Sequence, residues 1–224
     1  MFERRSAERF LDREDAGRQL LAPVRSALRS GNQGSPLVLG LPRGGVVVAA
    51  ELAEGLEAEV DVLVVRKVTH RSRPELALGA VTATAAYRNE NLLRRLGVSV
   101  ATFEELAAVQ AAEVRRRERS FRADRAPLVL SGRTVLVVDD GLATGATAIA
   151  AVTAARTQGP AWLGLAAPVG SVSAVAAILA LVDDVVCPLV PSTFMSVSRF
   201  YRDFPQTSDR EVQDTLAAAW RKTR

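Results

Sequence analysis

The fold of this chain is decided by one stretch, Val135-Leu136-Val137-Val138-Asp139-Asp140-Gly141-Leu142-Ala143-Thr144-Gly145-Ala146-Thr147. Its four leading apolar residues predict a buried strand, and two carboxylates stand where that strand ends. A loop of small residues then leads into a helix. The backbone N–H groups of such a loop, together with a helix N-terminus, can bind one phosphate, and the hydroxyls of Thr144 and Thr147 can add donors.

The two acids indicate what lies beside that phosphate. Asp139 and Asp140 would repel a bare anion, but a ribose fits between them and the loop because its hydroxyls can donate to carboxylates. Mg²⁺ could share the same carboxylates, since it prefers oxygen ligands. A plain crossover turn with capping threonines is the alternative. It is disfavoured because adjacent carboxylates without a ligand are unfavourable at a strand end.

Further apolar segments alternate with helical patterns along the chain. This alternation predicts an α/β fold with a mostly parallel sheet, whose ligands bind outside the carboxyl ends of the strands. The expected strands are 37–40, 60–66, 134–139, 162–168 and 184–189, and the expected helices between them are 46–56, 145–157 and 172–181. Further helices are expected at 12–28, 101–123 and 208–220, the last with Ser208 as its N-cap.

Two more segments after strands carry candidate anion ligands. In Gly40-Leu41-Pro42-Arg43-Gly44-Gly45, the glycines let the backbone approach an anion and Arg43 can grip a phosphate. The segment is neither a dinucleotide fingerprint nor a Walker loop. Residues 66–75 hold Arg66, Lys67 and His70, and so dense a positive charge predicts a mobile loop that closes over a substrate.

These motifs resemble a known family. Residues 135–147 match the thirteen-residue signature of type I phosphoribosyltransferases, and residues 40–45 are similar to the family's pyrophosphate loop. The Arg66-Lys67 pair resembles the start of the catalytic flexible loop in adenine and orotate phosphoribosyltransferases, with His70 where those enzymes usually have another lysine. Residues 74–81 and Phe200–Phe204 resemble an uncharacterised subgroup of phosphoribosyltransferase-domain proteins.

The resemblance implies a single phosphoribosyltransferase domain over 1–224, with an N-terminal helical cover and a C-terminal hood at about 188–207. It implies a pentosyltransferase of nucleotide metabolism, such as purine or pyrimidine salvage. Such an enzyme transfers 5-phosphoribosyl from phosphoribosyl pyrophosphate (PRPP) to a nitrogen acceptor and releases pyrophosphate, with Mg²⁺ as cofactor. It also implies a homodimer.

The implied roles fall on matching residues of this sequence. The catalytic residues are Asp139, Asp140, Arg43 and Lys67, and both acids could hold the metal, directly or through water. The PRPP-binding residues are Arg43, Gly44, Gly45, Arg66, Lys67, His70, Asp139, Asp140, Gly141, Leu142, Ala143, Thr144, Gly145, Ala146 and Thr147. The acceptor-binding residues are Phe194, Phe200, Tyr201 and Asp203, although these rings could equally pack the hood to the core.

One position bears on the acceptor. Enzymes for 6-oxopurines usually carry an aspartate where this chain has Ala143, so hypoxanthine and guanine rank below adenine, orotate, uracil or another amine. Two other classes stay open: a PRPP- or nucleotide-sensing regulator without turnover, and a module acting with a partner hydrolase. A phosphatase is disfavoured because no nucleophile has a paired base.

Composition narrows the class further. The chain has 224 residues and a net charge of +4, with one cysteine (Cys187) and one histidine (His70). A disulfide framework and a cysteine zinc site are therefore excluded. The longest apolar run, 174–182, is too short to span a bilayer, and residues 1–5 lack a signal-peptide core, so we expect a cytoplasmic protein. The arginine cluster at 115–125 is interpreted as a solvated helix face, and a nucleic-acid partner is not expected.

Overall fold

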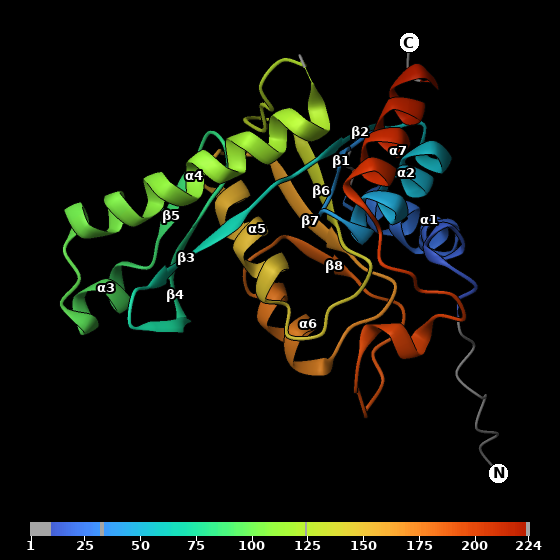
Figure 1. Cartoon of the computed structure of the whole chain (residues 1–224). Helices are drawn as coiled ribbons and strands as arrows, with labels where there is room; N and C mark the ends of the chain where they lie inside the picture. Colours follow the sequence, from blue (N-terminus) through green and yellow to red (C-terminus); the bar gives the residue numbers. More distant parts are fainter. Residues whose placement is uncertain (1–9, 32–33, 124, 223–224) are drawn as a thin grey trace.

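The computed structural model describes residues 10–31, 34–123 and 125–222, and it confirms the α/β class and the mostly parallel sheet (Figure 1). The main sheet is five-stranded, with the order β2-β1-β6-β7-β8, and a second sheet has the order β3-β4-β5. The strands are β1 (Leu37–Gly40), β2 (Glu59–Val62), β3 (Arg66–His70), β4 (Arg73–Val81), β5 (Ala86–Arg88), β6 (Thr134–Val138), β7 (Trp162–Ala166) and β8 (Asp184–Val186). The α-helices are α1 (Arg13–Ser30), α2 (Gly44–Leu56), α3 (Glu90–Leu96), α4 (Val100–Arg122), α5 (Ala146–Arg156), α6 (Val172–Leu179) and α7 (Asp209–Lys222), and a 3₁₀ turn, η1, covers Val197–Phe200.

The register of the main sheet brings its carboxyl ends to one edge. Gly40 lies opposite both Val62 and Val138, and Val138 lies opposite Ala166. The hydrogen bonding continues one residue further, since the Leu41 amide donates to the Val138 carbonyl over 2.8 Å. The loops that follow β1 and β6 therefore start side by side, which is what the sequence predicted for its two phosphate motifs.

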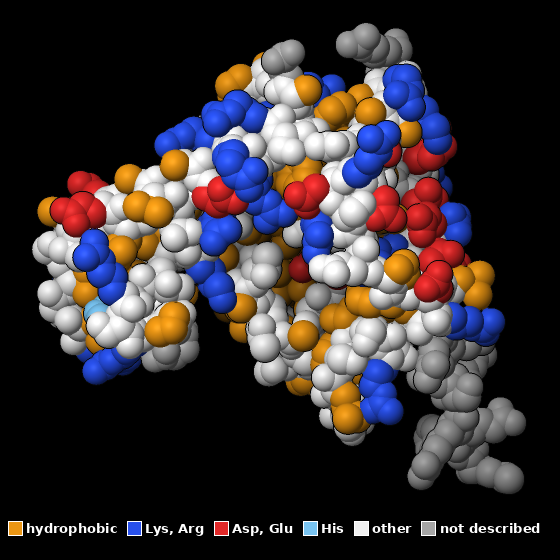
Figure 2. All heavy atoms as spheres, viewed as in Figure 1, with side chains coloured by type: hydrophobic (Ala, Val, Ile, Leu, Met, Phe, Trp, Pro, Cys, Tyr) orange, Lys and Arg blue, Asp and Glu red, His pale blue; other side chains and the backbone are white. Residues whose placement is uncertain are grey.

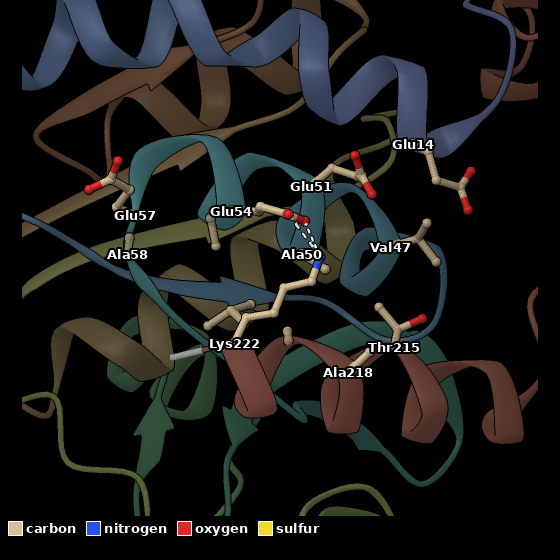
Figure 3. Close-up of a pocket in the computed structure, with 13 residues that line it drawn as sticks. Glu14, Val47, Ala50, Glu51, Glu54, Glu57, Ala58, Thr215, Ala218 and Lys222 are labelled. Carbon is tan, nitrogen blue, oxygen red and sulfur yellow. Dashed lines mark hydrogen bonds and ion pairs between the residues drawn. The ribbon is translucent and has the colours of Figure 1, made fainter. Parts of the chain in front are cut away.

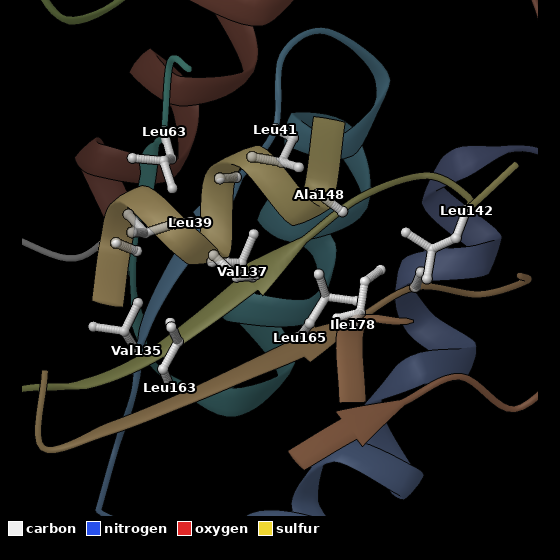
Figure 4. Close-up of a cluster of buried hydrophobic side chains, with 14 of the residues drawn as sticks. Leu39, Leu41, Leu63, Val135, Val137, Leu142, Ala148, Leu163, Leu165 and Ile178 are labelled. Atoms are coloured by element: carbon white, nitrogen blue, oxygen red, sulfur yellow. The ribbon is translucent and has the colours of Figure 1, made fainter. Parts of the chain in front are cut away.

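Both faces of the sheet are covered, which explains why its strands are apolar without alternation. One face presents Leu39, Val137 and Leu165 to the layer of α5 and α6 (Figure 4). The other face presents Val38 and Leu136 to α1 and α2. The position of β6 at the centre of the sheet fixes the two acids that follow it between well-packed layers.

The charged segment 66–75 is not the open loop that the sequence predicted. It belongs to an antiparallel hairpin, β3 and β4, which lies beside α3 and α4 at one side of the molecule (Figure 1). Val68 and Leu78 are fully buried in a cluster with Phe103 and Val114 of α4. Apolar residues between the charged ones therefore pack the strands onto a helix, and the predicted strand 60–66 ends early, at Val62.

The arginine cluster at the end of α4 is mostly exposed, as predicted, with Arg122 as the exception. Arg122 is buried and forms a two-point ion pair with Asp61, with Nε–Oδ1 at 2.9 Å and Nη2–Oδ2 at 3.0 Å. Arg116 pairs with Glu113, and the guanidinium of Arg125 lies over the Trp220 ring. Arg and Lys side chains gather along α4 on the surface (Figure 2), and the contacts of Arg122 with Asp61 and of Arg125 with Trp220 fasten the end of this helix to other elements of the fold.

The helix ends agree with the sequence. The side chain of Ser208 accepts a hydrogen bond from the Glu211 amide over 3.1 Å, and the Glu211 carboxylate accepts one from the Ser208 amide. This reciprocal capping confirms Ser208 as the N-cap of α7. Across the described ranges, no helix combines the length and the hydropathy needed to cross a bilayer. Residues 1–5, on which the signal-peptide prediction rests, lie outside those ranges.

Candidate functional site

A cavity of about 390 Å³ lies where the loops after β1 and β6 meet the C-terminal hood. Five predicted site residues from separate parts of the sequence line it: Arg43, Gly44, Asp139, Asp140 and Thr147. Its other walls come from α1 and from the segment before α7. The lining residues are Arg13, Leu41, Pro42, Arg43, Gly44, Asp139, Asp140, Thr147, Phe204, Pro205, Gln206 and Thr207.

The acid pair at the end of β6 faces this cavity, with one oxygen of each carboxylate already engaged. Asp139 Oδ1 accepts from the Asp140 amide over 2.9 Å, and Asp140 Oδ2 accepts from Arg13 Nε over 2.8 Å. The other oxygen of each acid accepts from no N–H group among the residues that the structure describes, and the two carboxyl groups lie within hydrogen-bond reach of each other. Two carboxylate oxygens are therefore free to accept from a ligand.

The negative charges of Asp139 and Asp140 repel each other. Burial raises the pKa of Asp139, and repulsion from the Asp140 carboxylate raises it further, while Arg13 opposes both effects. A ligand that supplies hydroxyl donors or a cation would relieve this repulsion. Hydroxyl-bearing or cation-bearing ligands are therefore favoured at this place over simple anions.

Hydrogen bonds fix the loop from Gly141 to Thr147 to the segment that follows β7. The Leu142 amide donates to the Val169 carbonyl, and the hydroxyl of Ser171 donates to the Ala143 carbonyl over 2.7 Å. Gly145 has a φ of 70°, a conformation that side chains disfavour, and it directly precedes α5. The loop thereby turns into the helix within one residue.

Not every amide of that loop is free for an anion. The amide of Leu142 is used as described, and that of Ala146 donates to the Thr144 hydroxyl over 3.3 Å. The amides of Ala143, Thr144 and Gly145 make no hydrogen bond to any other described residue. Ala143, Thr144 and Thr147 are exposed, so the donors predicted for a phosphate are present at the start of α5.

The glycine loop after β1 packs directly against the acids. A Cβ on Gly44 would lie 1.9 Å from Asp140 Oδ2, and one on Gly45 would lie 2.7 Å from the Val138 carbonyl oxygen. Both positions therefore need glycine to leave room for Asp140 and the end of β6, besides letting an anion approach the backbone. The sequence did not reveal this requirement. The Pro42–Arg43 peptide is cis, and the Arg43 guanidinium forms no hydrogen bond or ion pair in the described part of the chain, although its charge acts on Glu211.

The structure does not bring the basic residues of β3 into this cavity. Arg66 donates from Nε to Gln110 over 2.7 Å, His70 Nδ1 accepts from the Ser72 amide, and Lys67 is exposed. These three residues are absent from the described lining. Their roles in binding PRPP, and the catalytic role of Lys67, remain predictions that require the hairpin to move toward the cavity.

The predicted acceptor residues are divided between core and surface. Phe200 and Tyr201 are buried, and the Tyr201 hydroxyl donates to the Asp140 carbonyl over 2.7 Å. Phe194 stacks on Phe200 with ring centroids 5.5 Å apart, and Asp203 is exposed. In this structure, therefore, Phe200 and Tyr201 pack the hood to the site, which is the alternative that the sequence left open. Acceptor binding by any of the four stays a prediction.

Sequence reasoning missed Arg13 and Phe204. The guanidinium of Arg13 lies over the Phe204 ring, 3.7 Å from its centroid, and both side chains line the cavity. No local pattern could have paired Arg13 with an acid 127 positions away. The sequence pointed toward Phe204 only because this residue lies in the Phe200–Phe204 segment that resembles the uncharacterised subgroup.

A larger hollow of about 600 Å³ lies between α2 and α7 and contains no predicted site residue (Figure 3). Its acidic rim includes Glu51, Glu54 and Glu57, and the Lys222 amine is fixed to the Glu54 carboxylate at 2.7 Å. We therefore assign function to the smaller cavity, where the sequence motifs converge.

A parallel α/β sheet that presents two acids, a small-residue loop and a glycine loop at one carboxyl edge has the arrangement of a ligand-binding α/β protein, whose ligands lie outside the carboxyl ends of the strands. The particular family follows from the sequence. Residues 6–205 match the family model described as the phosphoribosyl transferase domain, and this chain belongs to that family.

Relatives agree with this assignment. Two curated proteins from two strains of Mycobacterium tuberculosis, named "Putative phosphoribosyl transferase" Rv0571c and MT0597, are each 44% identical over 213 residues. That match covers 95% of this chain but 47% of each relative, so the chain spans about half their length. The crystal structure of TT1426 from Thermus thermophilus is 39% identical with a TM-score of 0.83, covering 94% of this chain and 98% of that one.

Proposed function

We propose that this protein binds PRPP in the cavity at the end of β6 and transfers its 5-phosphoribosyl group to a nitrogen acceptor, releasing pyrophosphate. The observation that carries the proposal is the pair of free carboxylate oxygens on Asp139 and Asp140, directly before a loop with unused amide donors. This arrangement suits a pentose whose 5-phosphate lies on that loop.

Each part of PRPP then has a matching group. The amides at residues 143–145 and the hydroxyls of Thr144 and Thr147 would hold the 5-phosphate. The carboxylates would accept from the ribose hydroxyls, and the unpaired guanidinium of Arg43 would neutralise the departing pyrophosphate. Bond breaking places positive charge on the ribose ring, which the two acids would stabilise by position and field.

The acid pair also fits Mg²⁺. Protein sites for this ion usually offer one or two carboxylates and leave the other positions to water and substrate phosphates. No cluster of three or more potential ligands occurs in the described ranges, which agrees with such a sparse site. Asp139 and Asp140 would hold the ion directly or through water, and it would supply further charge neutralisation to the pyrophosphate.

For the acceptor, we propose only a chemical class. The side chain of Ala143 is a methyl group and cannot exchange a proton with a 6-oxopurine. Adenine, a pyrimidine base or another amine is therefore preferred. Phe194 is only half-buried, whereas Phe200 and Tyr201 are buried, so Phe194 is the aromatic ring of the predicted acceptor set that is most accessible for base stacking.

The alternative of a PRPP sensor receives less support. Its nucleic-acid arm would be the arginine cluster of α4, in which Arg122 is buried against Asp61 and Arg116 pairs with Glu113. These ion pairs reduce the charge available to a phosphate backbone. A mobility-shift assay with steep salt dependence would favour the sensor.

The proposal is tested in two steps. Calorimetric titration with PRPP and Mg²⁺ should give saturable binding, and the same titration of an Asp139→Asn/Asp140→Asn variant should not. Nucleobases and simple amines are then tested for pyrophosphate release. Binding without release for every acceptor would support the sensor, and absence of PRPP binding would contradict both functions.

A further inference from the structure

The N-terminal helix extends an arginine into the proposed PRPP site. Arg13 is the first residue of α1, and its side chain is only 9% exposed. Nε donates to Asp140 Oδ2 over 2.8 Å, and Nη1 donates to the Pro205 carbonyl over 2.8 Å. One side chain therefore connects an acid of the site with the C-terminal part of the hood.

The backbone around Arg13 is tied to the hood as well. The Phe10 amide donates to the Phe200 carbonyl over 2.9 Å, and the Arg202 amide donates back to the Phe10 carbonyl over 2.8 Å. The side chain of Asp12 caps α1 by accepting from the Asp15 amide. These bonds fix the position from which Arg13 reaches the cavity.

The glycine loop encloses the ion pair on another side. A Cβ at Gly44 would lie 2.5 Å from Arg13 Nε, besides its clash with Asp140. The guanidinium also lies over the Phe204 ring. The Asp140 carboxylate is thus held in one orientation by a planar donor that has little freedom to move.

Resting on the proposed function, we infer that Arg13 is a positioning residue of the PRPP site, which orients Asp140 so that its free oxygen accepts from a ribose hydroxyl. An unrestrained aspartate would lose this orientation by rotating its side chain. A purely structural role, in which Arg13 only fastens α1 to the hood, predicts a loss of stability without a change in sugar recognition.

The two roles differ in sugar selectivity. Ribose 5-phosphate differs from its 2-deoxy and 3-deoxy analogues by one hydroxyl each. With Mg²⁺ present, the ratio of Kd values for each analogue and ribose 5-phosphate reports how well a carboxylate receives that hydroxyl. We expect Arg13→Met to weaken PRPP binding by about 10- to 100-fold, the range for a hydrogen bond to a charged group. The selectivity ratio should fall toward one, as it should in Asp140→Asn.

Arg18→Met is the matched control. Arg18 lies on the same helix and pairs with Glu51 at 3.0 Å, but its side chain is 57% exposed. Binding and selectivity should remain at the wild-type values in this variant. Arg13→Lys keeps the charge without the planar fork and should recover part of the selectivity. If Arg13→Met does not fold, the sugar selectivity of Arg13→Lys tests the positioning role of Arg13 instead.

Each outcome has a distinct meaning. A folded Arg13→Met or Arg13→Lys variant with wild-type affinity and selectivity overturns the role of Arg13 alone. A variant that is destabilised but keeps its selectivity shows that the contact is structural, which also overturns it. If the wild-type protein binds neither PRPP nor ribose 5-phosphate, the proposed function itself fails and the inference fails with it.

Discussion

Replacing Gly44 with alanine should disable the proposed site without removing any functional group. The added Cβ would lie 1.9 Å from Asp140 Oδ2, and ordinary contact begins at 3.4 Å, so the carboxylate or the loop must move by about 1.5 Å. Overpacking of this kind lowers the free energy of unfolding by about 1–3 kcal/mol. A displacement on the order of 1 Å in a reacting group can reduce function about 100-fold.

The assay has two readouts and a control. Urea denaturation gives the change in stability, and calorimetric titration with PRPP and Mg²⁺ gives the affinity, which should fall by about 10- to 100-fold. Gly34→Ala serves as the control because a Cβ there has no atom within 4 Å and φ is not positive. If Gly44→Ala binds PRPP as tightly as Gly34→Ala does, the packing of the glycine loop against Asp140 does not matter for the site.

Three further predictions concern other parts of the molecule. Asp61→Ala should reduce the free energy of unfolding by about 3 kcal/mol because the buried Arg122 loses its two-point partner and keeps only Glu118 as an ion-pair partner, whereas Glu113→Ala should leave it almost unchanged; equal effects in denaturation curves would contradict this. Burial raises the pKa of the Cys187 thiol from 9.0 to about 12, so the thiolate fraction at pH 8 should be about 1,000-fold lower in the folded protein. Its reaction with Ellman's reagent should therefore be slow until urea unfolds the chain, and rapid labelling of the folded protein would disagree. Thr144→Val should weaken PRPP and nucleoside monophosphates about tenfold while sparing free pyrophosphate, and equal weakening of all three would place the 5-phosphate elsewhere.

Much of the fold could be predicted because its signals are local. The apolar run Val135–Val138 can be buried only as a central strand, and Ser208 with Glu211 forms a complete cap within four residues. The two phosphate motifs meet because parallel strands end at the same edge. The first two of these predictions need no contact between distant parts of the chain, and the third needs only the general rule that strands of a parallel sheet end at one edge.

The predictions that failed, and the residues that were missed, depend on contacts between distant parts of the chain. Charge dominated the interpretation of residues 66–75, whereas burial of Val68 against α4 decides their structure. Arg122 pairs not only with Glu118 one turn earlier on its own helix but also with Asp61, on a strand 61 positions earlier. Arg13 reaches Asp140 only because the chain before α1 pairs with the hood, a long-range arrangement that no sequence pattern encodes.

The most direct test is a crystal soaked with ribose 5-phosphate and Mg²⁺ at saturating concentration. Density for the phosphate should appear on the loop that begins α5, and the sugar hydroxyls should lie within hydrogen-bond distance of Asp139 and Asp140. A cavity that stays empty, or a sugar phosphate bound on another surface of the molecule, would contradict the account.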